Sequence, residues 1–371
     1  MSLAPPLQQI DGTFVLFRGK KLSYFGGCDY FRLSSHPRIL RRLRDGLSTY
    51  GLNVAASRRT SGNHQLYADL ELALKRFFKA PDAVLVSNGY MANLAVAQAL
   101  AGMFSHALID ARAHSSLVDA SLFLNCPVVQ FQHRNASDLA SQLARLGKNI
   151  RPIVLTDGLF AHDGSVAPLR KYSEQLPADG LLLADDAHGA GVLGRSGRGA
   201  VESENVARRR VVQTVTLSKS FGVYGGAILA SREICDRVRE RSAIFIGNTP
   251  MPLPLASAAL EALHIFSEQT GRRMRLARIT EQVKVVLRNA GFELPETVAP
   301  IVPVLPENEA AIKSLRQRLI SGGIFPPFVR YPGGPVGGYF RFVLSSEHTS
   351  AQVENLIATL LAWKKCPPRS S

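Results

Sequence analysis

The stretch that decides the fold is LLLADDAHGAGVLGRSGRG, residues 181–199. Its first four residues, 181–184, form an apolar run of strand length, which is typical of a strand buried on both faces of a parallel sheet. The run ends in the polar residues Asp185, Asp186 and His188. Ligands of open α/β sheets bind just beyond the carboxyl ends of the strands, so we expect these side chains where chemistry takes place.

A second stretch, TLSKSFGVYGG at 216–226, has the same design. The β-rich segment 211–216 is followed by Ser218, Lys219 and Ser220 and then by glycines. A carboxylate, an imidazole and an amine at the tips of neighbouring strands can hold and activate a pyridine aldehyde. The two stretches together therefore predict pyridoxal 5′-phosphate (PLP) as the cofactor, with no metal.

Strand and helix patterns alternate for some 170 residues from about residue 57. This alternation predicts an α/β fold with a mostly parallel sheet flanked by helices. The expected strands are 83–86, 107–109, 128–131, 153–155, 181–184 and 211–216, and the expected helices between them include 137–146 and 169–175.

The two ends of the chain have different patterns. Residues 13–16 and 22–25 predict a hairpin, and Ile39, Leu40, Leu43 and Leu47 have helical spacing. After three prolines (Pro250, Pro252 and Pro254) we expect a long helix over 256–289, a strand at 302–305, a helix at 309–321, a Gly/Pro-rich loop at 331–338, a strand at 339–344 and a helix at 350–363. We therefore expect an arm (1–45), a large cofactor-binding α/β domain (46–248) and a smaller α+β C-terminal domain (249–371).

Composition limits the class of protein. The chain of 371 residues is 46% hydrophobic and 20% charged, and no apolar run reaches the roughly 18 residues that a membrane span needs. The N-terminus lacks the pattern of a signal peptide. The four cysteines have no CxxC spacing, so neither a disulfide framework nor a zinc site is predicted; they are Cys28, Cys126, Cys235 and Cys366. We expect a cytoplasmic protein.

The formal net charge of +15 can be interpreted in two ways. The arginines are spread along the chain, which favours a solvated basic surface. The other reading is an acidic substrate, such as a CoA thioester or an acidic carrier protein. No basic stripe interleaved with aromatic residues and no helix-turn-helix pattern accompanies the charge, so nucleic-acid binding is not predicted.

Each residue of the expected site also has a plainer explanation. Asp185 can keep the pyridine nitrogen protonated, and His188 can donate to the phenolic oxygen, although an aspartate at a strand end is more often a cap and a lone histidine is more often structural. Lys219 lies in a tight polar turn and is suited to form the Schiff base. The turn 87–90, between a strand and a helix, offers backbone N–H groups to the phosphate. Each of these signals is weak alone, and only their combination indicates a PLP site.

Five segments in this order and spacing resemble the α-oxoamine synthases, PLP enzymes of fold type I that condense an amino acid with an acyl-CoA. They are SNGYMANLAV (87–96), HSSLVDAS (114–121), TDGLFAHDGSVAPL (156–169), DDAHGAGVLGRSGRG (185–199) and SKSFGVYGG (218–226). The resemblance covers about residues 28–350. It implies a PLP-dependent transferase fold with a seven-stranded, mostly parallel sheet and a smaller α+β C-terminal domain.

The resemblance also implies catalytic roles. Lys219 would form the Schiff base and, once released, take the substrate's α-proton. Asp185 would pair with the pyridine nitrogen, and His188 would reach the phenolic oxygen. His114 would stack on the ring face, and Arg341 would bind the substrate carboxylate through its two-pronged guanidinium.

The remaining implied contacts concern the phosphate. The backbone of Gly89 and Tyr90 and the hydroxyl of Thr216 would hold it. Asn248 and Thr249 lie where the family supplies a phosphate contact from the neighbouring subunit. The resemblance therefore implies a homodimer with a shared active site.

This chain departs from the family pattern at three places. Cys28 stands where an asparagine is usual, Asn53–Ala56 replace a glycine-rich loop, and Ala161 replaces a serine that often helps to hold the phenolic oxygen. Alanine and valine resist backbone conformations that glycine permits. The specificity for amino acid and acyl group is therefore the open part of the prediction.

The DDAHG segment followed by GVLG is most similar to the family member of biotin synthesis, which implies L-alanine and a pimeloyl thioester as substrates. A family member that uses glycine or serine and a PLP aminotransferase with the same core stay open. A non-catalytic subunit on this fold is disfavoured because Lys219 is retained. The acyl donor is expected to be an acyl-CoA or an acyl carrier protein.

Overall fold

The computed structural model describes residues 5–330, 334–335 and 337–365. The chain forms two compact units. One comprises residues 33–161 and 165–270, and we call it the sheet unit; the other comprises residues up to 32, 162–164 and those from 271 onward, and we call it the terminal unit. No helix among the described residues is long and apolar enough to cross a membrane.

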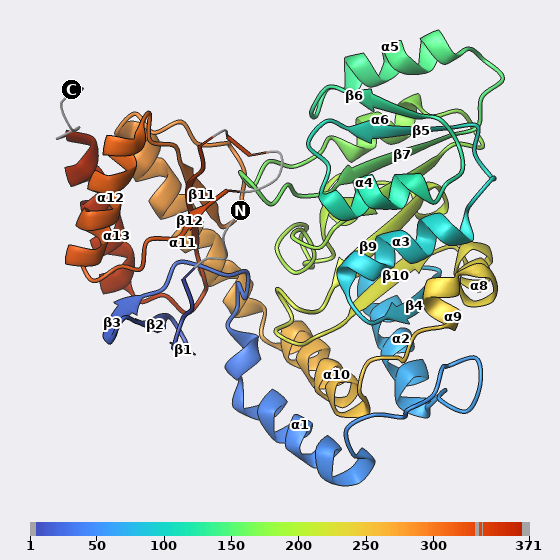
Figure 1. Cartoon of the computed structure of the whole chain (residues 1–371), viewed down its shortest axis with the longest axis horizontal. Coiled ribbons are helices and arrows are strands. Elements are labelled where there is room, and N and C mark those ends of the chain that lie inside the picture. Colours follow the sequence, from blue (N-terminus) through green and yellow to red (C-terminus); the bar gives the residue numbers. More distant parts are fainter. Residues whose placement is uncertain (1–4, 331–333, 336, 366–371) are drawn as a thin grey trace. The chain divides into compact units, whose positions relative to one another are not determined.

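The sheet unit is built on a seven-stranded sheet (Figure 1). The strand order is β4-β10-β9-β8-β7-β5-β6; β10 is antiparallel to both of its neighbours and all other pairs are parallel. This confirms the predicted fold class. The strands are β4 (Asp82–Val86), β5 (His106–Asp110), β6 (Val128–Phe131), β7 (Pro152–Asp157), β8 (Leu181–Asp185), β9 (Val211–Thr216) and β10 (Gly226–Ala230).

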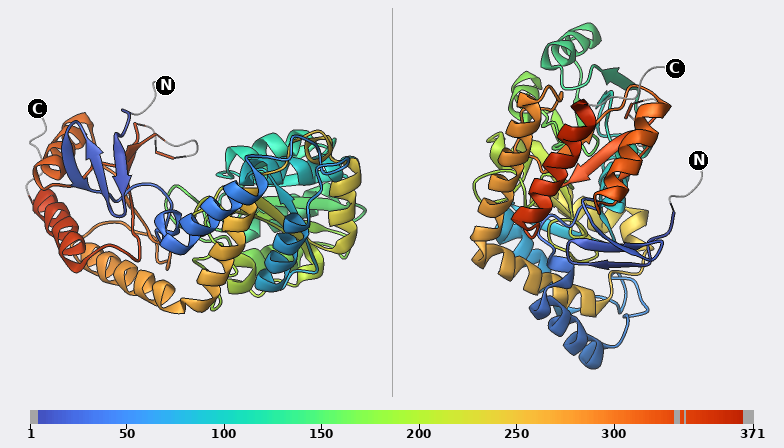
Figure 2. Two further views of the ribbon diagram at one scale, coloured as in Figure 1. Left: turned by 90° about the horizontal axis from the view of Figure 1, so that it is seen from below. Right: turned by 90° about the vertical axis from the view of Figure 1, so that its left-hand side faces the viewer.

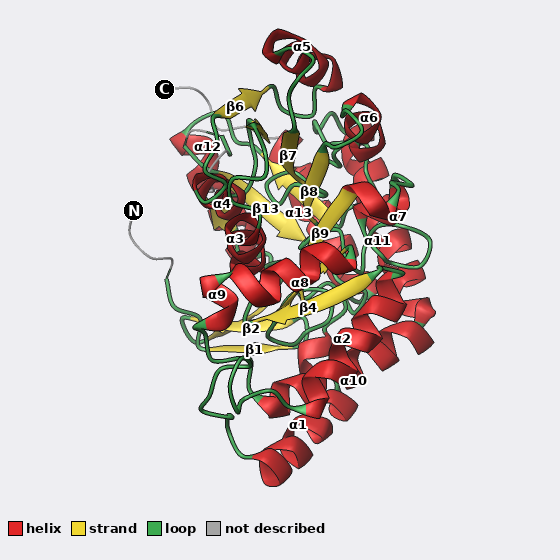
Figure 3. Ribbon diagram, turned by 90° about the vertical axis from the view of Figure 1, so that its right-hand side faces the viewer, coloured by secondary structure: helices red, strands yellow, loops and turns green. Residues whose placement is uncertain are grey.

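Helices flank this sheet (Figure 3). Every residue of β7, β8 and β9 is buried, as expected for strands covered on both faces. The helices of the unit are α1 (Pro37–Tyr50), α2 (Gln65–Phe78), α3 (Gly89–Ala99), α4 (Ser115–Leu122), α5 (Ala136–Leu146), α6 (Leu169–Gln175), α7 (Ala200–Ser203), α8 (Arg232–Arg241), α9 (Ala243–Ile246) and α10 (Leu253–Glu268), with 3₁₀ turns at Leu33–Ser35 and Arg208–Arg210.

The single helix expected over 256–289 is in fact two helices. Helix α10 ends at Glu268, Gln269 has non-helical backbone angles, and α11 spans Thr270–Asn289. Helix α10 packs on α1, where a Cβ on Gly46 would lie only 2.9 Å from the Cα of Pro254. The absence of a side chain at Gly46 therefore lets the two backbones approach. Helix α10 belongs to the sheet unit, whereas the sequence placed it in a C-terminal domain that begins at residue 249.

The terminal unit contains two three-stranded sheets (Figure 2). The N-terminal sheet has the order β1-β2-β3, and its β2 and β3 form the predicted hairpin. The other sheet has the order β11-β13-β12. The elements are β1 (Gln9–Asp11), β2 (Phe14–Phe17), β3 (Lys20–Ser23), α11, β11 (Ile301–Val304), α12 (Glu309–Ser321), β12 (Phe328–Val329), β13 (Tyr339–Val343) and α13 (Ser350–Lys365).

The N-terminal arm packs with the C-terminal residues instead of forming a separate segment. The Thr13 hydroxyl donates to Gln352 Oε1 at 3.0 Å, and the Val343 N–H donates to the Phe25 carbonyl at 2.8 Å. The terminal unit thus joins residues that the sequence divides between the arm and the C-terminal domain. Part of the expected loop at 331–338 lies outside the described residues, as does Cys366; the other three cysteines are free thiols.

A buried carboxyl, Asp186, anchors the loop that follows β8. Its Oδ2 accepts from Gln213 Nε2 at 2.6 Å and from the Ala200 N–H at 2.7 Å, while Oδ1 has no hydrogen-bond partner. A Cβ on Gly189 or Gly199 would lie 1.9 Å from one of its oxygens. Burial raises the pKa of Asp186 to about 7, although the Gln213 and Ala200 donors oppose this shift.

We predict that Asp186→Asn makes the fold more stable than the native chain at neutral pH. A carboxyl whose pKa rises on folding from 3.8 to about 7 stabilises the fold below its unfolded pKa and loses that contribution as the pH rises through the folded value. The stability advantage of the variant should therefore grow from about pH 4 to about pH 7, by at most about 1.4 kcal/mol per pH unit, and then level off.

Urea unfolding at a series of pH values measures this difference. Asp179→Asn, at an exposed carboxylate, is the matched control and should change the stability little. A difference between Asp186→Asn and the native chain that is the same at every pH would contradict the prediction.

Candidate active site

One cavity of about 310 Å³ lies in the sheet unit at the carboxyl ends of β7, β8 and β9. Seven residues predicted from the sequence line it together, although they are far apart along the chain: Gly89, Tyr90, His114, Asp185, His188, Thr216 and Lys219. The cavity is also lined by Asn88, Ser116, Asp157, Ala187 and Tyr224. The lysine, the aspartate and the two imidazoles thus converge on one space.

Asp185 is the last residue of β8 and is held by donors on both of its oxygens. Oδ1 accepts from the Ala187 N–H at 3.0 Å, and Oδ2 accepts from Asn93 Nδ2 at 2.6 Å. The side chain is buried. Both oxygens of this carboxyl group are thus held by hydrogen bonds on the wall of the cavity.

A second carboxyl, Asp157, ends the neighbouring strand β7 and is paired in register with Asp185. Its Oδ2 accepts from the His114 N–H at 2.8 Å. Burial and the nearby charge of Asp185 raise the pKa of Asp157 well above its ordinary value. A proton therefore binds to Asp157 much more readily than to an exposed carboxylate.

His114 precedes α4 and caps its first turn, because its Nδ1 accepts from the Ser116 N–H at 3.2 Å. Its ring meets that of Tyr90 edge to face, with centroids 6.1 Å apart and planes at 76°. Burial lowers the pKa of His114; the negative charge of Asp185 opposes this shift and the positive charge of Lys219 adds to it. The ring is therefore uncharged at neutral pH.

Lys219 lies in a compact turn between β9 and β10. The Leu217 N–H donates to the Gly225 carbonyl at 2.9 Å and closes the turn. The Ser220 hydroxyl donates to the Ala190 carbonyl at 2.6 Å, which ties the turn to the loop after β8. The backbone of Lys219 is therefore fixed relative to the loop that contains His188.

The start of α3 forms another wall of the cavity. Asn88 caps this helix by accepting from the Met91 N–H at 2.9 Å. A Cβ on Gly89 would lie 2.9 Å from the Cβ of Thr216, so only glycine lets Thr216 approach the helix so closely. The N–H groups of a helix start, next to a hydroxyl, are a favourable place for a phosphate.

This set of functional groups fits PLP. A buried carboxylate suits the pyridine nitrogen, an amine suits the aldehyde, and a helix start with a glycine suits the phosphate. All three line one cavity.

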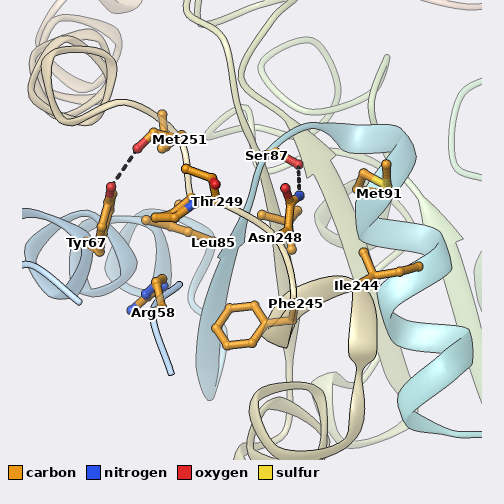
Figure 4. Close-up of a pocket in the computed structure, with 12 residues that line it drawn as sticks. Arg58, Tyr67, Leu85, Ser87, Met91, Ile244, Phe245, Asn248, Thr249 and Met251 are labelled. Atoms are coloured by element: carbon orange, nitrogen blue, oxygen red, sulfur yellow. Dashed lines mark hydrogen bonds between the residues drawn. The ribbon is translucent and has the colours of Figure 1, made fainter. Parts of the chain in front are cut away.

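Asn248 and Thr249 do not line this cavity. They line a separate pocket together with Arg58, Tyr67 and Phe245, as Figure 4 shows. In that pocket Asn248 Nδ2 donates to Ser87 Oγ at 3.0 Å.

Arg341 is in the terminal unit, on β13 between β11 and β12. It is buried, and its Nη1 and Nη2 lie 3.8 and 3.9 Å from the sulfur of Cys28.

Two of the three departures from the family pattern are in the sheet unit. Ala161 is buried. Ala55 has a left-handed φ of 49° within an Asx turn that is closed by the side chain of Asn53. Ala55 in the loop 53–56 thus adopts a backbone conformation that favours glycine.

Several residues of the site were not predicted. Asp157 had a visible signal, because it ends a buried strand in the same way as Asp185. Asn93 and Ser116 gave none, since polar residues inside helices are common and only the fold brings them to Asp185.

Comparisons with known proteins support the same class. Residues 29–360 match the family model described as aminotransferase class I and II. The chain is 35% identical to 8-amino-7-oxononanoate synthase of Thioalkalivibrio sulfidiphilus over 345 residues, which is 92% of this chain and 88% of that protein.

Two solved structures extend the comparison. Serine palmitoyltransferase from S. paucimobilis, bound to a PLP–myriocin adduct, superimposes with a TM-score of 0.91 at 27% identity and covers 98% of this chain and 92% of its own. For 8-amino-7-oxononanoate synthase from Francisella tularensis the TM-score is 0.79 at 25% identity, over 92% and 97% of the two chains. The chain therefore belongs to the class I and II aminotransferase family and, within it, to the α-oxoamine synthases, which are PLP-dependent acyltransferases.

Proposed function

We propose that this protein condenses L-alanine with a pimeloyl thioester to form 8-amino-7-oxononanoate. The observation that supports the chemistry is the single cavity lined by Lys219, Asp185, His114 and His188. The similarity of almost the whole chain to 8-amino-7-oxononanoate synthases supports the choice of substrates.

The residues around the cavity have defined tasks in this proposal. Asp185 would hold the pyridine nitrogen, His188 the phenolic oxygen, and the start of α3 with Thr216 the phosphate. When bound, PLP provides an electron sink for the negative charge that develops at the substrate's α-carbon.

Lys219 is the proposed base that removes the proton from this carbon, because its amine lines the cavity and its turn is fixed. The α-carbon forms a bond to the acyl carbon while the thioester C–S bond breaks. The thiolate leaves with the proton that Lys219 had removed, and the bond between the α-carbon and the carboxylate breaks with release of carbon dioxide. Lys219, protonated again from solvent, is also suited to donate this second proton to the α-carbon, which completes the aminoketone.

Arg341 is the proposed partner of the substrate carboxylate. It is a buried guanidinium, and this group binds carboxylates through two parallel hydrogen bonds. The acyl donor in the proposal is a thioester of coenzyme A or of a carrier protein, and a basic chain of net charge +15 attracts either one.

A second candidate is condensation of L-serine with a longer acyl thioester. The observation that favours it is the close structural similarity to serine palmitoyltransferase, with a TM-score of 0.91. Three 8-amino-7-oxononanoate synthases are 34–35% identical to this chain over 92–96% of its length, so we place 8-amino-7-oxononanoate synthesis first.

The proposal includes a cytoplasmic homodimer that shares its active sites. Val118 and Leu122 lie on one face of α4, four residues apart, and Leu122 is 73% exposed. Phe123 continues this apolar surface at the end of the helix. Exposed apolar groups next to a site are typical of subunit contacts, and most homodimers are two-fold symmetric.

The substrate assignment predicts the outcome of one assay panel. With PLP and pimeloyl-CoA, L-alanine should release free thiol and carbon dioxide in equal amounts, and glycine and L-serine should react at least about ten times more slowly. One methyl group in a fitted pocket gives discrimination of roughly 10-fold or more. Faster reaction of serine with palmitoyl-CoA would favour the second candidate, and amino transfer to a 2-oxo acid without thiol release would contradict both.

Lys219→Ala should reduce product formation by at least about 100-fold, the usual contribution of a positioned acid–base group. Borohydride reduction of the PLP-loaded native protein should leave the pyridoxyl label on the peptide that contains Lys219. Lys171→Ala changes an exposed lysine of α6 and should leave both readouts unchanged. A label on a different lysine would contradict the assignment.

The shared site predicts complementation between two inactive variants. Subunits with Lys219→Ala are mixed under exchange conditions with subunits that carry both Asn248→Ala and Thr249→Ala. If Asn248 and Thr249 serve the partner's site, half of the dimers are mixed and each has one intact site, so about a quarter of the native activity should return. If they serve only their own subunit, no activity returns and the shared site is wrong.

A further inference from the structure

Five polar side chains in and next to the wall of the cavity form one hydrogen-bonded chain. Thr214 Oγ1 donates to Asn93 Oδ1 at 2.6 Å. Asn93 Nδ2 lies 2.6 Å from Asp185 Oδ2 and 2.9 Å from Ser116 Oγ. Ser116 Oγ in turn lies 2.7 Å from His114 Nδ1. Asn93, Thr214 and Ser116 are fully buried, so these bonds form without competition from solvent.

The direction of the bond at His114 follows from a backbone group. The Ser116 N–H lies 3.2 Å from His114 Nδ1, and a backbone N–H only donates. Nδ1 must therefore be an acceptor, and the proton of the neutral ring is on Nε2. The Ser116 hydroxyl, 2.7 Å from the same nitrogen, must also donate to it.

The Ser116 hydroxyl has two acceptors within reach but only one proton. His114 Nδ1 lies at 2.7 Å and Asp185 Oδ2 at 3.4 Å. Asn93 Nδ2 donates both to this carboxylate oxygen and to the Ser116 oxygen. Because Asn93 supplies the hydrogen bond that Asp185 needs, the Ser116 proton remains directed at His114.

We propose that Asn93 and Ser116 are positioning residues that hold His114 as the uncharged Nε2–H tautomer. This tautomer follows from contacts within the protein alone, whereas its benefit rests on the proposed function. A neutral ring avoids a second positive charge next to a protonated pyridine, and Asp185 stays available as the partner of that pyridine.

The charged and titratable groups around His114 act in both directions. They come from four other elements or turns and from α4 itself: Tyr90, Asp119, Asp157, Asp185 and Lys219. The charges of Asp185 and Asp119 favour the protonated ring, while burial and Lys219 oppose it. A donor aimed at Nδ1 also favours the neutral ring, so its loss should raise the pKa of His114.

The experiment observes the ring directly. The full-length, PLP-loaded protein is labelled with ¹⁵N-histidine, and the His114 signals are assigned by their loss in His114→Gln. In the native protein Nδ1 should be unprotonated and Nε2 protonated near pH 7. Ser116→Ala should move the titration midpoint of His114 upward by about 0.5–1 pH unit, the effect of one hydrogen bond, and Ser116→Thr should restore it.

Asn93→Leu tests the coupling. Without its amide, Asp185 should draw the Ser116 proton away, so the His114 midpoint should rise as in Ser116→Ala. In the Ser116→Ala background, Asn93→Leu should add no further rise. Ser121→Ala is the matched control, since this buried serine of α4 bonds to the Val118 carbonyl and should leave His114 unchanged.

A proton on Nδ1 in the native protein, or no shift in Ser116→Ala, would overturn the proposal. An equal Asn93→Leu effect in both backgrounds would overturn the coupling. If Asn93→Leu does not fold, the Ser116 variants still decide the tautomer. The nuclear magnetic resonance readout does not depend on turnover, so failure of the alanine assay would count against the proposed function and not against this network.

Discussion

The structure depends on the alignment of parallel strands that end in carboxyl groups. Because β7 and β8 run in the same direction and in register, Asp157 and Asp185 are side by side at one edge of the sheet. Two buried carboxyls so close repel each other, and each needs donors to offset the loss of water. The His114 N–H supplies one, and Asn93 and the Ala187 N–H supply the others. These donors come from α3, from the residue that precedes α4 and from the loop after β8, so all three segments help to hold the two carboxyl groups.

The sequence predicted most of the sheet because its strands are short runs rich in β-branched and apolar residues. The strands expected at 128–131 and 211–216 agree with β6 and β9 to the residue, although β9 is buried throughout and β6 is partly exposed. Strand β10 was missed because GAILA follows a turn of glycines and is itself rich in glycine and alanine, which are depleted in strands. The break at Gln269 was missed because helical periodicity continues on both sides of it, and only the backbone angles of Gln269 show that α10 ends there.

The part of the site that could be predicted lies at strand ends and turns. Asp185 and Lys219 each follow a buried strand, so topology alone brings them to one edge. Asn93 and Ser116 belong to helices, and their contacts with Asp185 join residues 92 and 69 positions apart. Spacing along a helix says nothing about such contacts. The residues that hold the carboxylate therefore appear only once α3 and α4 are placed on the sheet.

The residues that line the cavity and the residues that depart from the family pattern are different sets in this chain. The groups suited to PLP line one cavity in the sheet unit. Cys28, Asn53–Ala56 and Ala161 are not among its lining residues, and the Cys28 sulfur lies 3.8 Å from Arg341 Nη1. A thiol accepts hydrogen bonds more weakly than the amide of asparagine, so it competes less for the guanidinium N–H groups. In the proposed function, the arginine that binds the substrate carboxylate has a thiol as its neighbour, while Lys219 and Asp185 are the residues expected from the family pattern. Substrate choice can change in such a protein without any change in the type of reaction.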